Sequence, residues 1–161
     1  MTARLRPGQP ADVDAVAAVF LACWQRSYHQ VLPDAVRAVY DESSARELWQ
    51  RALSSPGTVV AEVNGRGVVG VVRFGASAGT GHVFSLYVHP DSQDQGLGRK
   101  LLDVAIESLR SSSYDEATLW VFANNVAARG FYERLGWRPD GGRRVEPEYG
   151  RPEIRLRRSL Q

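Results

Sequence analysis

The sequence has little of several features that define whole classes of protein. It contains a single cysteine, Cys23, so no internal disulfide can form and a disulfide-stabilised secreted scaffold is excluded. The longest apolar run, residues 15–24, has ten residues, whereas a helix that spans a bilayer needs about 20. The arginines near the N-terminus have no apolar stretch behind them, so we expect no secretory signal and a cytoplasmic location.

The chain also has little net charge. The formal net charge is only +2, which favours neither nucleic acid nor a membrane surface as a partner. Arginines gather toward the C-terminus, but Asp140, Glu146 and Glu148 offset them. The alternation predicts that Arg155 and Arg157 lie on one solvent-exposed face at the edge of a sheet.

Apolar residues make up 43% of the chain and charged residues 24%, which is typical of a globular protein, and the length suits one domain over residues 1–161. The dipeptide Asn64-Gly65 predicts a hairpin, and residues 75–81 are expected to form a glycine-rich loop. Patterning predicts strands at 3–6, 58–63, 68–74, 82–88, 117–122 and 153–157 and helices at 13–24, 44–53, 97–109 and 125–135. This order predicts an α/β (α+β) fold with a mixed sheet flanked by helices.

The most informative segment joins the strand 82–88 to the helix that begins at Leu97. The strand stops at His89-Pro90, and two glycines, Gly96 and Gly98, open the helix. Glycine accepts positive φ and has no Cβ, so several backbone N–H groups can point at one anion at the helix N-terminus. The segment therefore predicts a phosphate-binding loop.

The spacing of these glycines does not match the common nucleotide-binding motifs. A dinucleotide-binding turn needs a third glycine where Leu101 stands, and a P-loop needs Gly-Lys-Ser or Gly-Lys-Thr, which is absent. A strand-to-helix turn that binds no ligand would account for two glycines alone. The ligand-binding possibility that remains is the extended pyrophosphate of another cofactor.

Two motifs together resemble one family. The pattern Gln93-x-x-Gly96-x-Gly98 after Val88-His89-Pro90 resembles the acetyl-CoA signature of the GNAT superfamily of N-acetyltransferases. The helix that starts at Asn125 and contains Phe131-Tyr132-Glu133 resembles a second motif of that family, with Trp137 in place of the usual phenylalanine. The resemblance covers about residues 3–158.

The resemblance implies a mostly antiparallel sheet in which two central parallel strands, 82–88 and 117–122, splay apart to hold acetyl-CoA as co-substrate. It implies no metal. The implied cofactor-binding residues are Leu86, Tyr87, Val88, Gln93, Asp94, Gln95, Gly96, Leu97, Gly98, Arg99 and Asn125.

The same resemblance implies direct attack of an amine on the thioester in a ternary complex. Tyr132 is expected to protonate the leaving thiolate, and the Val88 N–H to stabilise the developing oxyanion. A glutamate that serves one branch of the family is replaced here by Trp120. His82, at the head of its strand, is the candidate to accept the proton of the amine; the alternative is that it merely ends a loop.

Tyr28 and His29 follow the first helix and are expected to line the acceptor pocket, with Glu148 or Tyr149 from the loop before the last strand. The expected acceptor is a primary amine of a small molecule or peptide, and a homodimer is one expected assembly, since dimers are common in the family. The alternative is a non-catalytic domain that senses acyl-CoA. Cys23 has no visible base partner and is predicted to be an inert buried thiol.

Overall fold

The computed structural model describes residues 2–161; Met1, the first residue of the predicted domain, lies outside them. The strands are β1 (Ala3–Pro7), β2 (Thr58–Val63), β3 (Gly67–Ser77), β4 (Thr80–Val88), β5 (Glu116–Phe122), β6 (Arg138–Val145) and β7 (Pro152–Ser159). The α-helices are α1 (Val13–Ala22), α2 (Asp34–Arg37), α3 (Glu42–Leu53), α4 (Leu97–Ser111) and α5 (Val126–Arg134). A single π-helical turn, Cys23–Ser27, extends α1.

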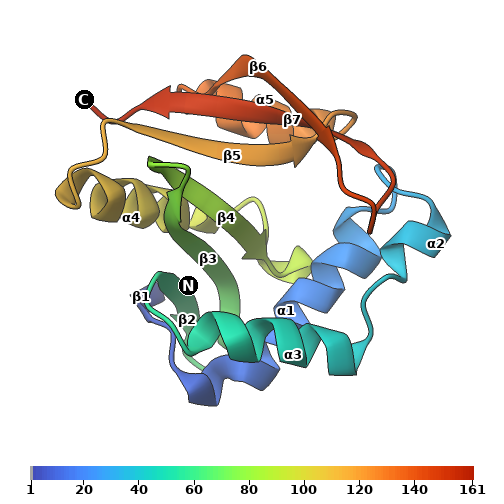
Figure 1. Ribbon diagram of the computed structural model, residues 1–161. Helices are drawn as coiled ribbons and strands as arrows, with labels where there is room; N and C mark the ends of the chain where they lie inside the picture. Colours follow the sequence, from blue (N-terminus) through green and yellow to red (C-terminus); the bar gives the residue numbers. More distant parts are fainter. Residues whose placement is uncertain (1) are drawn as a thin grey trace.

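The strands form one sheet in the order β1-β2-β3-β4-β5-β7-β6 (Figure 1). Neighbouring strands are antiparallel except β4 and β5, which are parallel. Their pairing covers only Gly81–Val83 against Ala117–Leu119, and from there the two strands diverge. The mixed sheet and its splayed central pair are therefore confirmed.

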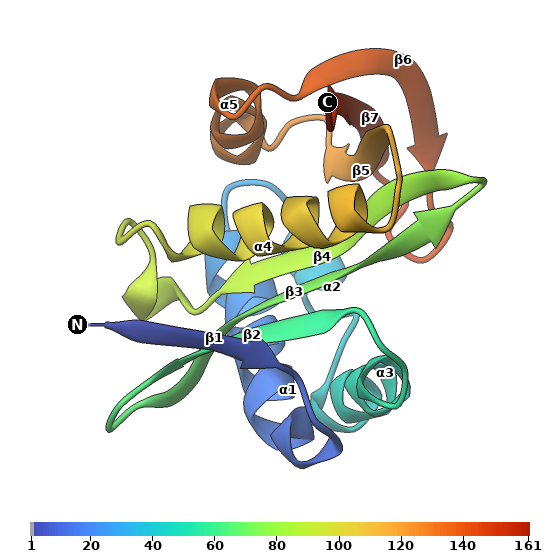
Figure 2. The ribbon, with the colours of Figure 1, turned by 90° about the vertical axis from the view of Figure 1, so that its left-hand side faces the viewer.

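Helices cover both faces of the sheet and bury two apolar clusters (Figure 2). On one face α4 packs through Leu101, which is fully buried, together with Trp137, the residue just before β6. On the other face α1 and α3 contribute Phe20 and Trp49. Because successive side chains of a strand point to opposite faces, Val71 belongs to the second cluster and Val72 to the first. The two faces of β3 and β4 therefore carry separate sets of contacts.

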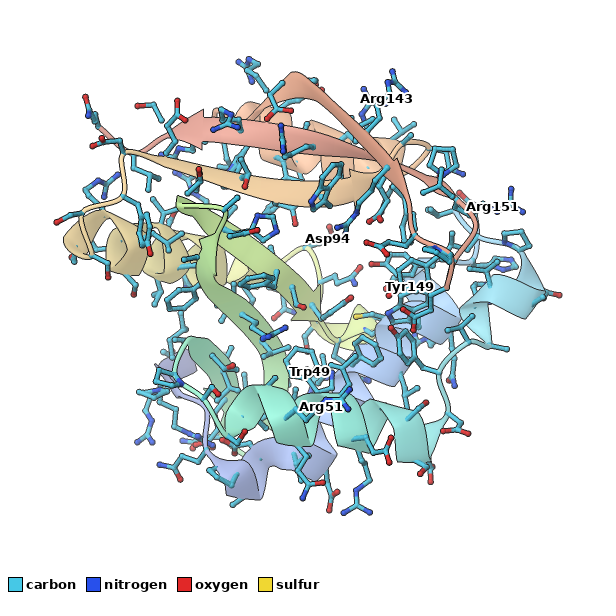
Figure 3. All side chains as sticks on the ribbon, in the orientation of Figure 1. Trp49, Arg51, Asp94, Arg143, Tyr149 and Arg151 are labelled. Carbon is cyan, nitrogen blue, oxygen red and sulfur yellow. The ribbon has the colours of Figure 1, made fainter. Side chains whose placement is uncertain are left out.

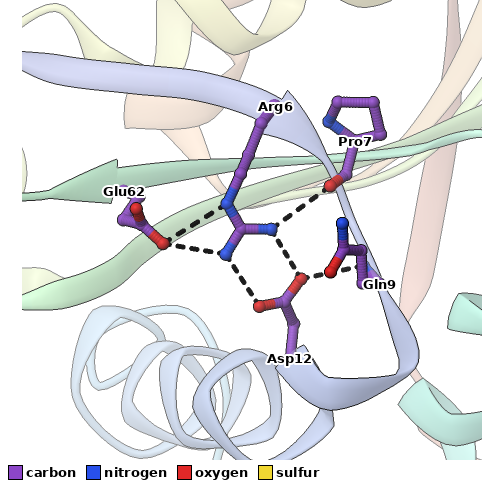
Figure 4. A network of polar contacts seen from close by, with 5 residues as sticks. All are labelled: Arg6, Pro7, Gln9, Asp12 and Glu62. Atoms are coloured by element: carbon purple, nitrogen blue, oxygen red, sulfur yellow. Dashed lines mark hydrogen bonds and ion pairs between the residues drawn. The ribbon is translucent and has the colours of Figure 1, made fainter.

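A network of charges fastens β1 to the start of the first helix (Figure 4). The Arg6 guanidinium donates to both carboxylate oxygens of Asp12, at 2.9 Å each, and to Glu62 on β2 at 2.8 Å. Asp12 also accepts from the Gln9 backbone N–H at 2.8 Å. These bonds hold the carboxylate in its charged form, and the pKa of Asp12 is lowered, chiefly by Arg6.

The structure corrects several sequence expectations. Helix α3 starts earlier than predicted, because Asp41 rather than Ser44 is the N-cap and accepts from the Ser44 N–H at 2.8 Å. The predicted loop 75–81 is mostly strand, since β3 runs to Ser77 and β4 begins at Thr80. Strand β6 was not predicted, since it contains Pro139 and two adjacent glycines and has no apolar alternation.

The predicted solvent-exposed sheet edge at Arg155 and Arg157 was also wrong. Strand β7 lies between β5 and β6, so it is an interior strand of the sheet. Arg155 and Arg157 both donate through Nε to Asp140 on β6, at 2.7 and 3.1 Å. Within residues 2–161, no helix is both long enough and apolar enough to span a bilayer.

Candidate active site

A cleft of about 420 Å³ opens where β4 and β5 separate. Strand β4 lines it with residues 82–88, and β5 with residues 119–122. Helix α5 adds Tyr132, and its N-cap Asn125 lies at the same wall. Aromatic side chains that follow α1 or precede β7 close the far end. Sequence segments that are far apart therefore meet at one opening in the sheet.

The backbone of β4 faces the cleft in an alternating pattern. The His89 N–H donates to the Val69 carbonyl at 2.8 Å, so Val69 and His89 form a hydrogen-bonded pair of the β3–β4 ladder. In an antiparallel pair such residues alternate with residues whose backbone groups point away from the partner strand. The amide and carbonyl groups of Leu86 and Val88 therefore point toward β5, and those of Tyr87 point toward β3. Leu86 and the Val88 N–H thus offer free backbone groups at the opening, whereas the Val88 carbonyl already accepts a side-chain hydrogen bond.

The loop from Gln93 to Gly98 closes one end of this exposed strand edge. Two of its residues have positive φ, Asp94 at 63° and Gly96 at 80°. Asp94 is labelled in Figure 3, in the loop between β4 and α4. The Gln93 side chain anchors the loop by donating to the Val88 carbonyl and to the Ser27 hydroxyl, at 3.0 Å each. Positive φ in such a loop turns successive N–H groups to one side, which is a geometry suited to an anion.

Helix α4 starts at this loop with Gly96 as its N-cap. Its first N–H groups have no partner within the helix, and the helix dipole adds partial positive charge there. A Cβ added at Gly96 would meet no protein atom within 4 Å, and one at Gly98 would lie 3.5 Å from the Phe131 ring. The space beside both glycines is therefore free for a ligand, although the positive φ of Gly96 also favours glycine for the backbone itself. Their presence fits a pyrophosphate that approaches the backbone closely.

Positive side chains stand near the same helix start, although neither points into a buried site. Arg99 is exposed, and its Nε lies 3.9 Å from Asp103 one turn later on α4. Lys100 is also exposed. Cations are unusual in the first turn of a helix, because the dipole there is already positive. A bound anion would offset this repulsion.

Tyr132 lies in the cleft on α5, where its ring packs edge-on against Phe131 and Trp137 at centroid distances of 5.2 and 6.1 Å. Burial raises the pKa of Tyr132 above its ordinary value of 10, so the phenol is protonated at neutral pH. Asn125 caps the same helix, since its Oδ1 accepts from the Ala128 N–H at 3.2 Å. The cap and the packed ring fix the position of the Tyr132 hydroxyl.

His82 lies at the base of the cleft with only 6% of its surface exposed. Its Nδ1 forms a hydrogen bond of 2.8 Å with the Thr118 hydroxyl on β5. Burial first, and then the charges of Arg144 and Arg155, lower its pKa to about 4. His82 is therefore neutral at pH 7, and it is a weaker base than a histidine in solution.

The two residues expected at the acceptor pocket behave differently. Tyr28 lines the cleft, and its ring packs edge-on against Trp24 at 5.1 Å. His29 is exposed and is not among the residues that line the cleft. Tyr149 reaches the same wall from the loop between β6 and β7, where Figure 3 shows it beside helix α1, and its hydroxyl is 2.8 Å from that of Tyr40. Tyr28 and Tyr149 are thus brought together, whereas His29 is not.

Sequence reasoning missed a charged pair on the cleft wall. Glu153 on β7 is buried and receives a hydrogen bond of 3.0 Å from Arg144 Nε on β6, whose guanidinium lies 4.4 Å from the centre of the Trp120 ring. Burial raises the pKa of Glu153. The alternation that starts at Glu153 is visible in the sequence, but without β6 it indicates a strand that faces solvent.

Cys23 is a buried thiol at the back of the cleft. Its Sγ lies 3.1 Å from the Val88 carbonyl oxygen, and burial raises its pKa to about 12. A thiol with so high a pKa is not a nucleophile at neutral pH. Among the residues that the structure describes, no group of three or more His, Cys, Asp or Glu side chains could hold a metal ion.

The splayed strands, the amide loop at the start of α4 and the tyrosine on α5 define an acetyltransferase of one family. Residues 18–137 match the family described as "Acetyltransferase (GNAT) family", and this range is more than half of the chain. The protein therefore belongs to the GNAT acetyltransferase family, which confirms the resemblance drawn from the two motifs.

Two curated proteins show how far the similarity extends. A "Probable N-acetyltransferase" of Mycobacterium tuberculosis is 30% identical over 148 residues, which are 86% of this chain and 81% of that protein. A mycothiol acetyltransferase of Beutenbergia cavernae is 40% identical over 75 residues, which are 47% of this chain. The matched part is only 24% of the length of that mycothiol acetyltransferase.

Solved structures share the whole fold. PaiA N-acetyltransferase from Thermoplasma acidophilum, in complex with coenzyme A, has a TM-score of 0.79 and 16% identity, and the match covers 99% of each chain. YncA from Salmonella typhimurium, with acetyl-CoA, has a TM-score of 0.73 and 24% identity over 100% of this chain and 95% of that one. At these identities the likeness shows the fold alone.

Proposed function

We propose that this protein is an acetyl-CoA-dependent N-acetyltransferase that acetylates a primary amine of a small molecule or peptide in a ternary complex. One observation carries the proposal: the exposed edge of β4 runs from the cleft that holds Tyr132 to the amide loop 93–98. An extended co-substrate with a diphosphate at one end fits this layout. Solved structures of the same fold with coenzyme A or acetyl-CoA support the choice of ligand.

When bound, acetyl-CoA supplies an activated acetyl thioester. The amides of Gln93 to Gly98 would grip the diphosphate, with Arg99 adding positive charge at the same end. The outward-facing backbone groups of Leu86 would pair with the pantetheine arm, with the Val88 N–H beside them, and Asn125 would contact the arm from the start of α5. The backbone of Tyr87 faces β3, so Tyr87 would contribute through its side chain, which packs on the opposite face of the sheet from α4.

Two groups of this chain would act at the reacting carbonyl. The Val88 N–H points into the cleft and would donate to the carbonyl oxygen as that oxygen gains negative charge; one such donor is typically worth about 10²–10³ in rate. Tyr132 would give its phenolic proton to the departing sulfur. Because burial raises its pKa, Tyr132 holds this proton at neutral pH and suits the role of acid rather than base.

The amine must lose a proton before or during attack. His82 is neutral at pH 7 and can receive it, but a base works best when its pKa is near the working pH. The pKa of about 4 therefore makes His82 a poor match for this task. We propose that its main contribution is the bond to Thr118, which holds β4 against β5 at the base of the cleft.

The alternative function is a non-catalytic domain that senses acyl-CoA. A direct test titrates coenzyme A and acetyl-CoA into the protein by calorimetry and then measures thiol release with a panel of primary amines. The enzyme hypothesis predicts binding and amine-dependent thiol release, while a sensor predicts binding without release for every amine. If coenzyme A does not bind, or if it binds without protecting the loop 93–98 from hydrogen exchange, both functions are wrong.

A further inference from the structure

Arg73 on β3 carries a positive charge in the cleft that no described residue neutralises. Its side chain lines the cleft and is half-buried, yet within residues 2–161 its guanidinium has no hydrogen bond and no ion pair. Arg144, on the opposite wall, is paired at 3.0 Å with both Glu146 and Glu153. Desolvation lowers the pKa of Arg73, but a guanidinium stays charged at neutral pH. Burying an unpaired cation, even partly, costs free energy unless an anionic ligand pairs with it.

A β-bulge holds this guanidinium in place. Arg73 lies opposite Ser85 and Phe74 lies opposite Val83, so Phe84 is the extra residue on β4. Phe84 is 42% exposed, and the Arg73 Cζ lies 4.9 Å from the centre of its ring. A guanidinium stacked on a ring keeps its N–H edge free to donate. The bulge therefore places the Phe84 ring against the Arg73 guanidinium at the wall of the cleft.

The groups around Arg73 suit an anion and not a second cation. Ser85, directly across from Arg73, also lines the cleft and places a hydroxyl donor nearby. His82, which also lines the cleft, is neutral at pH 7 and adds no negative charge. No carboxylate lies on the β3–β4 side of the cleft among the described residues that line it.

Arg73 also lies away from the region expected for the diphosphate. Its side chain shares the sheet face of Val71, which packs on the cluster of α1 and α3, whereas α4 covers the other face. Its partner Ser85 precedes Val88 by three residues, which is about 10 Å along a strand. The ligand of Arg73 would therefore be the acceptor rather than the phosphate end of coenzyme A.

We propose that Arg73, assisted by Ser85, binds a carboxylate of the acceptor, so that the acceptor is a small amino carboxylate such as a free amino acid. This inference rests on the proposed acetyltransferase function and names its substrate class. A guanidinium and a carboxylate match in a planar, bidentate arrangement, which orients the acceptor as well as binding it. The aromatic wall of Tyr28, Tyr40 and Tyr149 offers an apolar surface for the acceptor side chain.

A binding experiment tests this without turnover. Calorimetry would compare N-acetyl-leucine, N-acetyl-phenylalanine and N-acetyl-methionine with their carboxamides in the presence of coenzyme A. The wild-type protein should bind at least one carboxylate tenfold or more tightly than its carboxamide, and Arg73→Gln should remove that preference. Arg73→Lys keeps the positive charge but lacks the planar pair of donors, so it should retain part of the preference for the carboxylate. Equal affinity of the wild type for every acid and its amide would overturn the proposal.

Kinetics with matched acceptors give a second readout. Each amino acid would be compared with its amide and with its decarboxylated amine, and Arg73→Gln should raise KM for the amino acid at least tenfold while changing the other two less than twofold. Arg4→Gln, an exposed arginine on the edge strand β1, is the control and should change none of them. An equal loss on all three acceptors, or a weaker affinity for coenzyme A, would assign Arg73 to structure or to the co-substrate. If the wild type does not bind coenzyme A, the proposed function fails, whereas binding and turnover without a carboxylate preference reject only the role of Arg73.

Discussion

His82 Nδ1 and Thr118 Oγ1 lie 2.8 Å apart and join β4 to β5 one residue before the two strands stop pairing. The bond lies among buried side chains, since His82 and Thr118 are 6% and 5% exposed. It therefore acts as a clamp at the base of the cleft, where the sheet must hold together on one side and open on the other. Such a buried bond is sensitive to the protonation of the imidazole.

The first prediction concerns pH and stability. The pKa of His82 is about 4 in the folded protein and about 6.5 in an unfolded chain, so the unfolded state takes up its proton first as the pH falls. The contribution of neutral His82 should be complete above pH 6.5 and lost between pH 6.5 and 4, by up to about 3 kcal/mol. Urea unfolding at several pH values should show that the free energy of unfolding falls less steeply with decreasing pH in His82→Gln than in the wild type. The exposed His29→Gln is the control and should follow the wild type.

The second prediction separates two roles of His82. As a positioning residue, His82 should be replaceable by glutamine, which can still bond to Thr118, with less than a tenfold loss of kcat/KM and an unchanged pH profile between 6 and 8. A general base is typically worth about 10²–10⁴ in rate. A hundredfold loss in a well-folded His82→Gln variant would make His82 the proton acceptor after all.

The third prediction concerns Tyr132. Phenylalanine keeps the ring packed against Phe131 and Trp137 but removes the phenolic proton, so Tyr132→Phe should bind coenzyme A like the wild type and release thiol about 10²–10⁴ times more slowly. Steady-state thiol release and calorimetry on the same samples provide the measurement. Turnover equal to that of the wild type would remove Tyr132 from the mechanism. Tyr114→Phe, at a tyrosine between α4 and β5 that packs on the core, controls for the loss of a hydroxyl elsewhere.

The fourth prediction concerns Gly98. Its added Cβ would make only an ordinary contact of 3.5 Å with Phe131, and alanine is favoured over glycine in a helix, by up to about 1 kcal/mol in the interior. Gly98→Ala should therefore be as stable as the wild type or more so, yet bind coenzyme A at least tenfold more weakly, because the methyl group keeps the diphosphate off the helix amides. Thermal unfolding would measure the unchanged or higher stability of the variant, and calorimetry would measure its weaker binding of coenzyme A. If the variant binds coenzyme A as tightly as the wild type, the diphosphate does not approach this backbone. Ser111→Ala, at the other end of α4, is the control and should change neither stability nor binding in this way.

The fifth prediction concerns the network in Figure 4. Asp12→Asn removes the charge that pairs with Arg6 at a largely buried position and should cost about 2 kcal/mol at pH 7. The pKa of Asp12 is lowered in the folded state, so its stabilisation is present above its ordinary pKa of 3.8 and lost as the pH falls below it. Urea unfolding should show the stabilities of the two proteins converging as the pH falls below 3.8. Asp14→Asn, whose carboxylate is 75% exposed and pairs with Arg46, should change stability by less than about 0.5 kcal/mol.

Much of the candidate site was predictable because its residues are adjacent in the chain. The loop 93–98 needs glycines at fixed spacing for a local backbone shape, and the cap of α5 needs Asn125 three residues before the N–H that it accepts from. Strand β6 could not be predicted, because its pairing with β7 overrides the poor strand propensity of Pro139 and of Gly141 and Gly142. The wrong prediction for Arg155 followed directly, since β7 would be an edge strand only if β6 were absent.

The sequence by itself determined the glycine loop, the capped helix that carries Tyr132 and the family to which the chain belongs, since each depends on residues a few positions apart. Only the tertiary structure decided that His82 is neutral, that Glu153 is buried with Arg144 and that Arg73 stands unpaired in the cleft among the residues described. Those properties depend on desolvation and on charges brought together from distant strands. Neither desolvation nor the pairing of distant charges can be predicted from the spacing of residues along the chain.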